Sequence, residues 1–229
     1  MEFHPDKCKV LRITNKRKLI IHQYHMHNKN LEEVDEAKYL GIIIHKKLSW
    51  KPHVNSITKK ANQTRAFLQR NLRTCSREVK VQCYKTYVRP IIEYASPAWD
   101  PVGEGNKALR EKLDMVQRKA ARFVFGDWRY TSSPSSMIVE LDLQSLQARR
   151  TEARLKFMHK YLYGGIDIQE SFVTRARCSD VRLKLVNSRV QAHQNSFIPT
   201  TIAQWNILPS SVVNQSNFNI FSKYIQMYE

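Results

Sequence analysis

Three stretches of the sequence carry apolar residues at the spacing of an α-helix, and they constrain the fold more than any other feature. They cover residues 54–72, 77–99 and 106–125. In each stretch an apolar residue recurs every three or four positions, which places these residues on one helix face. Because short connections join the stretches, we expect antiparallel neighbouring helices that bury these faces against one another.

The expected core positions follow from these stripes. Pro90 interrupts the second stretch and lacks a backbone N–H, so we expect a kink or a restart there. Gly126 is the expected C-cap of the third helix. The core positions are Val54, Ile57, Ala61, Thr64, Leu68 and Leu72 in the first stretch, Cys83, Tyr87, Ile91 and Ala95 in the second, with Tyr84, Val88 and Tyr94 beside them, and Leu109, Leu113, Val116, Ala120 and Val124 in the third.

A short β-rich segment precedes the helices. Ile42–Ile44 are three consecutive β-branched residues, which predict a strand buried on both faces. His45–Lys47 is the expected polar turn, and Leu48–Trp50 the expected return path. Gly41 lacks a Cβ, so another backbone or a ligand can approach closely there. The acidic residues 31–36 are interpreted as a solvated connection.

These patterns predict an α+β, mainly α fold: a small antiparallel sheet at the N-terminus followed by a basic helical bundle. We divide the chain into residues 1–50, 51–130 and 131–229, with the Ser/Thr/Pro-rich residues 131–136 as the internal boundary. The last region is expected to be helical, with a basic loop within 166–196 and a terminal helix over 217–228. Its long helix, 143–163, is expected to turn Leu146, Ala153, Phe157 and Tyr161 inward.

The charge balance indicates the class of partner. A formal net charge of +18 and a pI near 9.9 predict association with a polyanion, most commonly nucleic acid. The apolar runs are too short to span a bilayer, and residues 1–7 lack the apolar segment of a signal peptide. The four cysteines show no close paired spacing in the sequence, so we expect an intracellular protein with reduced thiols, in the nucleus or the cytoplasm.

Motifs for catalysis or metal binding are not found in the sequence. It contains no Gly-rich phosphate loop, no nucleophile elbow and no Asp-Asp pair. His22, His25 and His27 lie close together, but no cysteine completes a zinc set, so partly exposed strand histidines are the preferred interpretation.

Six short stretches, in order along the chain, resemble the reverse transcriptase polyprotein of non-LTR (LINE-type) retrotransposons, especially the jockey and chicken-repeat groups. Residues 3–11 resemble motif D of that family, and residues 37–41 resemble its motif E, the primer-grip hairpin. Residues 48–54 resemble the segment that enters the thumb. Residues 84–95, 116–123 and 205–209 complete the series.

The resemblance implies an RNA-directed DNA polymerase of which this chain is a C-terminal fragment, from the end of the palm through the thumb. Tyr39, Leu40 and Gly41 are then expected under the primer end. Lys7 matches a motif D lysine that would protonate the leaving pyrophosphate; its alternative is a solvated turn lysine. The family enzyme needs Mg²⁺, held by an Asp-Asp box. Without that box we expect no cofactor in this fragment, no catalytic residue, and no primer extension by the chain alone.

The implied partners are RNA and DNA, as a template–primer, and the missing N-terminal part of the polyprotein; no membrane is expected. Two alternatives remain: a stand-alone basic nucleic-acid-binding remnant, and a helical module that binds a protein partner. For each basic residue an ordinary solvated helix face is the competing interpretation. The expected nucleic-acid-binding residues are Lys59, Lys60, Arg65, Arg70, Arg118, Lys119, Arg122, Arg149 and Arg150.

Overall fold

The computed structural model describes residues 4–14, 16, 18, 20–164, 166, 173–176 and 179–227. The chain forms two compact units, Met1–Ser56 and Ile57–Glu229. Helices dominate, and the strands form small two-stranded sheets, so the predicted α+β, mainly α class is confirmed. The first division falls six residues after the expected 50/51 boundary. The expected boundary at 130/131 is replaced by a single compact unit, in which Gln117 Nε2 donates to the Gln144 carbonyl across 3.0 Å.

Among its described residues, the first unit contains three separate strand pairs instead of one antiparallel sheet. Strand β1 (Lys9–Leu11) pairs in parallel with β4 (Glu32–Val34), and the connection between them carries the antiparallel pair β2 (His25–Met26) and β3 (Lys29–Asn30). A short 3₁₀ turn, Pro5–Lys7, precedes β1. The predicted acidic connection is therefore a strand. Its carboxylates pair with cations of the β1 segment, Lys9 with Glu32 at 3.2 Å and Arg12 with Glu33 at 2.9 Å.

The third pair is a tight hairpin of β5 (Glu36–Tyr39) and β6 (Ile42–His45), in which Tyr39 lies opposite Ile42. Leu40 and Gly41 form its two-residue turn, with φ angles of 46° and 88°. Two positive φ angles are typical of the type I′ turn, whose twist matches the flanking strands. The expected turn at 45–47 is present, since the Leu48 N–H donates to the His45 carbonyl at 2.8 Å, but the strand reversal that pairs β5 with β6 lies at Leu40–Gly41. Ile42–Ile44 are half-buried rather than buried on both faces, since β6 pairs with β5 alone among the described strands.

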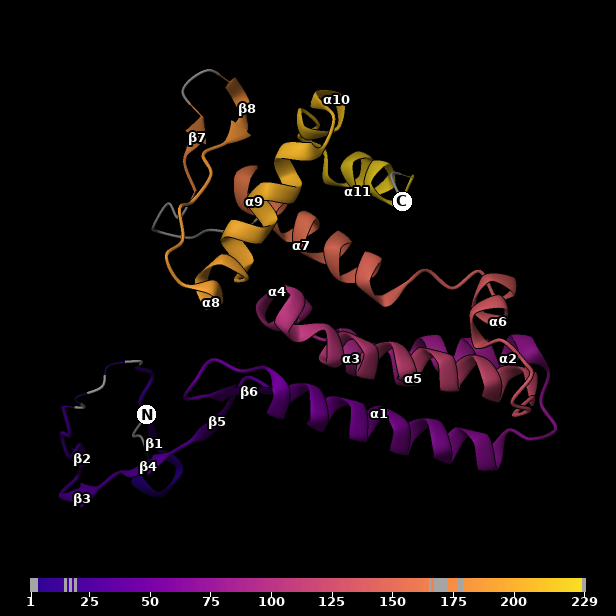
Figure 1. Ribbon diagram of the computed structural model, residues 1–229, viewed down its shortest axis with the longest axis horizontal. Coiled ribbons are helices and arrows are strands. Elements are labelled where there is room, and N and C mark those ends of the chain that lie inside the picture. Colours follow the sequence, from indigo (N-terminus) through magenta and orange to yellow (C-terminus); the bar gives the residue numbers. More distant parts are fainter. Residues whose placement is uncertain are drawn as a thin grey trace. The chain divides into compact units, whose positions relative to one another are not determined.

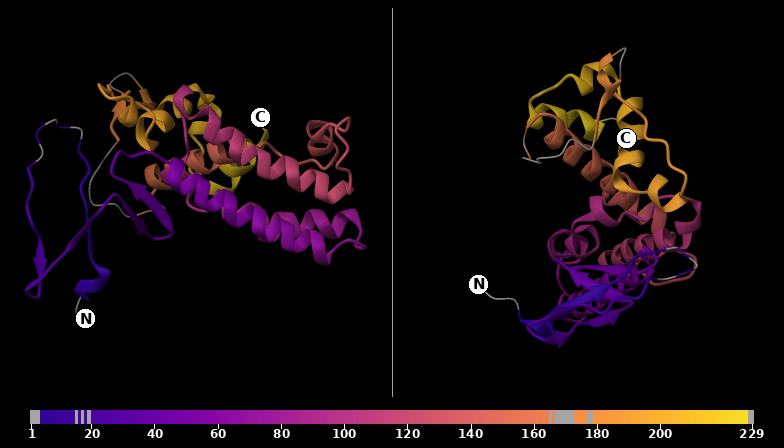
Figure 2. Two further views of the ribbon diagram at one scale, coloured as in Figure 1. Left: turned by 60° about the horizontal axis from the view of Figure 1, so that its bottom comes forward. Right: turned by 90° about the vertical axis from the view of Figure 1, so that its left-hand side faces the viewer.

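Helix α1 (Lys51–Asn71) begins in the first unit and continues in the second. Next come α2 (Arg77–Cys83), a π-helical turn (Tyr84–Val88), α3 (Arg89–Glu93), α4 (Ser96–Trp99), a 3₁₀ turn (Glu104–Asn106) and α5 (Lys107–Phe125). The chain reverses direction twice, so that α2 to α4 run antiparallel to α1 and α5 (Figure 1), as predicted. Figure 2 shows α1 and α5 as neighbouring, nearly parallel rods.

The stripe of α5 is confirmed, because Leu109, Leu113, Val116, Ala120 and Val124 are all buried. Gly126 caps the helix at a φ of 67°, as expected.

The stripe predicted for the second stretch is wrong by one residue. Tyr84, Val88 and Ile92 are buried, whereas Tyr87 is 57% exposed. The same segment contains a π-helical turn, in which the N–H of Arg89 donates to the carbonyl of Tyr84. No restart occurs at Pro90: the chain stays helical from α2 through α3, and the proline lies in the first turn of α3, directly after the π-helical turn.

The C-terminal part contains α6 (Pro134–Glu140), α7 (Leu146–Leu162), β7 (Arg175–Ala176), β8 (Ser179–Leu183), α8 (Gln191–Gln194), α9 (Phe197–Ile207), α10 (Ser210–Val213) and α11 (Phe218–Met227). The terminal helix is as predicted. The expected basic loop contains the β7–β8 hairpin. There Arg182 does not face solvent freely but donates to the carbonyls of Asn206 and, at 3.0 Å, Leu208. Arg177 lies outside the described residues.

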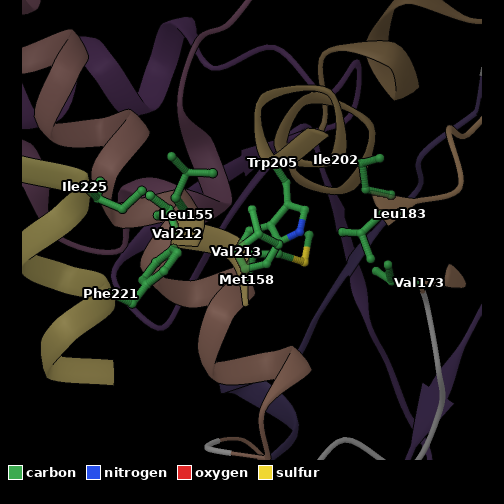
Figure 3. Close-up of a cluster of buried hydrophobic side chains, with 10 residues drawn as sticks. All are labelled: Leu155, Met158, Val173, Leu183, Ile202, Trp205, Val212, Val213, Phe221 and Ile225. Carbon is green, nitrogen blue, oxygen red and sulfur yellow. The ribbon is translucent and has the colours of Figure 1, made fainter. Parts of the chain in front are cut away.

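One hydrophobic cluster joins α7, β8, α9, α10 and α11 (Figure 3). Its members are Leu155, Met158, Val173, Leu183, Ile202, Trp205, Val212, Val213, Phe221 and Ile225. The Ser145 hydroxyl caps α7 by accepting from the N–H of Ala148 at 3.0 Å, which fixes where this helix starts. The inward face of α7 differs from the prediction: Leu146 is buried, but Phe157 is exposed, and Arg150 and Arg154 take inward positions.

A buried histidine adds a titratable group beside this cluster. His159 stacks on Phe221, with ring centroids 4.2 Å apart, and its Nε2–H donates to the Gln215 carbonyl at 2.6 Å. Its Nδ1 is buried without a hydrogen-bond partner among the described residues. The neutral ring therefore fits the site, and burial lowers the pKa of His159.

We expect the free energy of unfolding to fall as the pH drops below about 6.5. In that range His159 binds a proton in the unfolded chain, whereas its lowered pKa keeps it neutral in the folded protein. One such group contributes at most about 1.4 kcal/mol per pH unit. Urea unfolding followed by helical circular dichroism between pH 7.5 and 5 measures this slope. His159→Gln should flatten it; His53, whose pKa burial also lowers, supplies a remaining part. An unchanged slope in the variant would contradict this role.

Candidate nucleic-acid interface

The solvent-facing side of α1 carries cations around an aromatic ring. Lys59, Lys60 and Arg70 are exposed, and Phe67 between them is 58% exposed. Ala61 and Leu68 on the opposite side are buried. We call Lys59, Lys60, Gln63, Phe67 and Arg70 the α1 face. Residues four apart share one side of a helix, so this face is a single continuous strip.

The cations of the α1 face have no anionic partner among the described residues, unlike Lys9 or Lys46, which pair with carboxylates. Lys59 and Arg70 are eleven positions apart, about 16 Å along the axis at 1.5 Å per residue. A nucleic-acid strand rises about 3.4 Å per phosphate, so the face matches the rise of about five phosphates. The α1 face can therefore exchange its solvent counterions for a phosphate backbone.

Arg65 was expected on this interface, but in the structure its side chain contacts other residues of the protein. Its guanidinium lies 5.6 Å from the centroid of the Trp128 ring, and Nη1 donates to Gln69 Oε1 at 2.6 Å. Its Nε is buried without a hydrogen-bond partner in the described part of the chain. Burial lowers the pKa of Arg65. Arg65 thus holds Trp128 instead of reaching outward to a phosphate.

The three expected residues of α5 have different surroundings. Arg118 is exposed and Lys119 is half-buried, and both remain candidates for phosphate contact. Arg122 instead donates to the carbonyls of Arg129 and Ser132, each at 2.9 Å, and so fixes the loop that follows α5. Nearby, burial raises the pKa of Asp114, and the charges of Arg150, Arg118 and Arg110 oppose this rise.

Arg149 and Arg150 were predicted to bind nucleic acid, but the structure places both side chains in ion pairs within the protein. Arg149 forms a bidentate ion pair with Glu93, at 2.5 and 2.9 Å, and these hydrogen bonds raise the pKa of the guanidinium. Arg150 is 1% exposed and donates through Nε to Asp100 Oδ1 at 2.8 Å. Arg154 pairs with the other oxygen of Asp100. These arginines join α7 to the segments around α3 and α4.

The residues that resemble motifs D and E lie in the first unit. Tyr39, Leu40 and Gly41 form the tip of the β5–β6 hairpin, and the side chains of Tyr39 and Leu40 are 66% and 73% exposed. Lys7 is exposed at the end of the 3₁₀ turn, and its N–H donates to the His4 carbonyl at 3.0 Å.

The three clustered histidines do not converge. His22 packs edge-on against Tyr24, and His25 Nδ1 lies 2.8 Å from Asn30 Oδ1. Across the residues that the structure describes, no group of three or more His, Cys, Asp or Glu side chains is placed to hold a metal ion. Among the described helices, none has both the length and the hydrophobicity needed to cross a bilayer.

Two exposed aromatic residues, Phe67 and Trp128, were missed at the sequence level. The signal for Phe67 was available, because it lies off the apolar stripe of its helix. No protein-family model, curated protein or solved structure matches this chain.

Proposed function

We propose that this chain binds the backbone of a template–primer, an RNA–DNA hybrid, through the α1 face, as the C-terminal part of a non-LTR retrotransposon reverse transcriptase. The observation that carries the proposal is the α1 face itself: three exposed cations, unpaired among the described residues, surround an exposed ring on one helix. The net charge of +18 supports a polyanionic partner.

The order of elements also supports the proposal. The Tyr39-Leu40-Gly41 sequence that resembles a primer-grip motif forms a hairpin turn, and α1 follows that hairpin directly in the chain. In the resembled family the thumb follows the primer grip in the same order. Arg118 and Lys119 are further candidates for backbone contact, whereas Arg65, Arg122, Arg149 and Arg150 are occupied within the protein.

Binding of this kind releases counterions from the phosphates and does not read bases. We therefore expect similar affinity for hybrids of different sequence. Fluorescence anisotropy with labelled RNA–DNA hybrids of two unrelated sequences, at fixed salt, tests this. Strong preference for one sequence, or no binding to either, would contradict the proposal, and the latter result would favour the protein-interaction module.

The retrotransposon origin has a separate test. The encoding DNA should continue upstream, in frame or broken by stop codons, into a sequence for an aromatic-Ala-Asp-Asp box. Hybrid binding without any such upstream sequence would instead support the stand-alone nucleic-acid-binding remnant.

A further inference from the structure

A pocket of about 640 Å³ lies where α5 ends, beside the start of α2. It is lined by Arg77, Phe125, Gly126, Asp127, Trp128 and Arg129. Two guanidinium groups and two aromatic rings thus meet around one opening. Guanidinium groups bind phosphate and aromatic rings stack on bases, so the lining has groups that can bind both the phosphate and the base of a nucleotide.

The loop that carries the pocket is held rigidly. Asp127 accepts from Arg129 Nε at 3.1 Å, from Arg129 Nη2 at 2.9 Å and from the Ser132 hydroxyl at 2.5 Å. These bonds hold the pKa of Asp127 far below its usual range, and its charge is balanced by Arg129. With Arg122 bonded to the loop carbonyls, the loop is organised before any ligand arrives.

Trp128 presents an open ring within this rigid frame. Arg65 lies over the ring, and 47% of Trp128 remains exposed to solvent. The support from Arg65 fixes the orientation of the indole, which lowers the entropy lost when a second flat group stacks on it.

Arg77 supplies the cation that a phosphate can reach. Its guanidinium lies 4.4 Å from the centroid of the Phe125 ring, and it pairs with Glu140 at 3.3 Å. That ion pair is solvent-exposed on both sides, so it contributes little and can exchange for a phosphate.

We propose that this pocket holds one unpaired nucleotide of a single strand, RNA or DNA, with its base stacked on Trp128 and its phosphate against Arg77. The proposal rests on the proposed function, because it gives the unpaired template next to the hybrid a place on the same protein. Stacking on an aromatic ring tolerates any base, as a template requires.

Tryptophan fluorescence reports on this site selectively. Trp99 and Trp205 are buried and Trp50 is half-buried, so Trp128 is the one exposed indole among the described residues. An oligo(U) or oligo(dT) strand should quench the emission of the full chain. AMP alone, at the same nucleotide concentration, should quench less, because it lacks the neighbouring phosphates.

Trp128→Ala should weaken single-strand binding about tenfold, and should leave binding to a blunt-ended hybrid unchanged. Tyr130→Ala is the matched control: Tyr130 lies in the same loop, is fully exposed and does not line the pocket, so single-strand affinity should not change. Arg77→Gln should reduce single-strand affinity without altering the ring, and so tests the pocket even if the Trp128 variant folds poorly.

Wild-type single-strand affinity in both Trp128→Ala and Arg77→Gln would overturn the pocket and leave hybrid binding by α1 intact. Equal losses for single strand and hybrid would also overturn it, as would quenching by AMP equal to that by the strand. Failure of the proposed function looks different, because the full chain would then bind no hybrid.

Discussion

Replacing Asp100 with asparagine should lower the free energy of unfolding by about 3–5 kcal/mol. Asp100 is the shared counter-charge of Arg150 and Arg154, whose side chains are 1% and 3% exposed. Asparagine keeps the shape but removes the charge of the carboxylate that pairs directly with both buried guanidinium groups. Arg150 Nη2 already lacks a hydrogen-bond partner among the described residues, so the site has little capacity to adapt.

The matched control for this variant is Glu140→Gln, which removes the same charge from the exposed pair with Arg77. Exposed ion pairs contribute about 0–1 kcal/mol, so the control should unfold almost like the wild type. Urea unfolding at pH 7, followed by helical circular dichroism, compares the two. If Asp100→Asn costs no more than Glu140→Gln, the buried ion network does not hold α7 in place.

Reversing the charges of Lys59, Lys60 and Arg70 together, each to glutamate, should weaken hybrid binding by about 100- to 1,000-fold near 0.1 M salt. Each neutralised phosphate contributes about −0.9 to the slope of log K against log salt. One contact therefore raises the binding constant at 0.1 M salt nearly tenfold over its value at 1 M salt. Glutamate also adds repulsion, so the loss should not be smaller than the loss of three contacts.

The control for total charge is the triple reversal of Lys184, Arg189 and Lys223, which are also exposed. Both variants change the net charge by six units, because each reversal changes it by two. Charges that do not touch the nucleic acid act on it only through long-range electrostatics, which salt screens. The control should therefore bind with an affinity within about threefold of the wild type. Equal losses in the two variants would show that the overall charge, and not the α1 face, governs binding.

The sequence predicted those features that depend on neighbouring residues. The buried stripe of α5 could be predicted from the periodicity of that helix alone. The cap could be predicted because Gly126 has no Cβ and adopts a positive φ easily. Local patterns do not predict the position of a side chain when its partner lies far away in the sequence. Arg150 resembles a solvent-facing residue within its helix, but its partner Asp100 is fifty positions away and turns it inward.

The same limit applies to the interface. Arg65 and Arg70 look alike in the sequence, and only the position of Trp128 beside Arg65 separates a supporting arginine from an available one. The one-residue error in the second stripe arose because Cys83, Tyr87 and Ile91 have the same four-residue spacing as the buried Tyr84, Val88 and Ile92, so apolar spacing did not separate the two sets. The parallel pairing of β1 with β4 depends on contacts across twenty residues.

The most direct test of the α1 face as a phosphate-binding surface is the salt dependence of hybrid binding by the full chain. If about six phosphates are neutralised, log K should fall against log salt with a slope near −5. The triple reversal on α1 should flatten the slope to about −2.5, since three contacts are lost, while the control reversal should keep it near −5. Affinity that does not change with salt, or an α1 variant with the wild-type slope, would contradict the account.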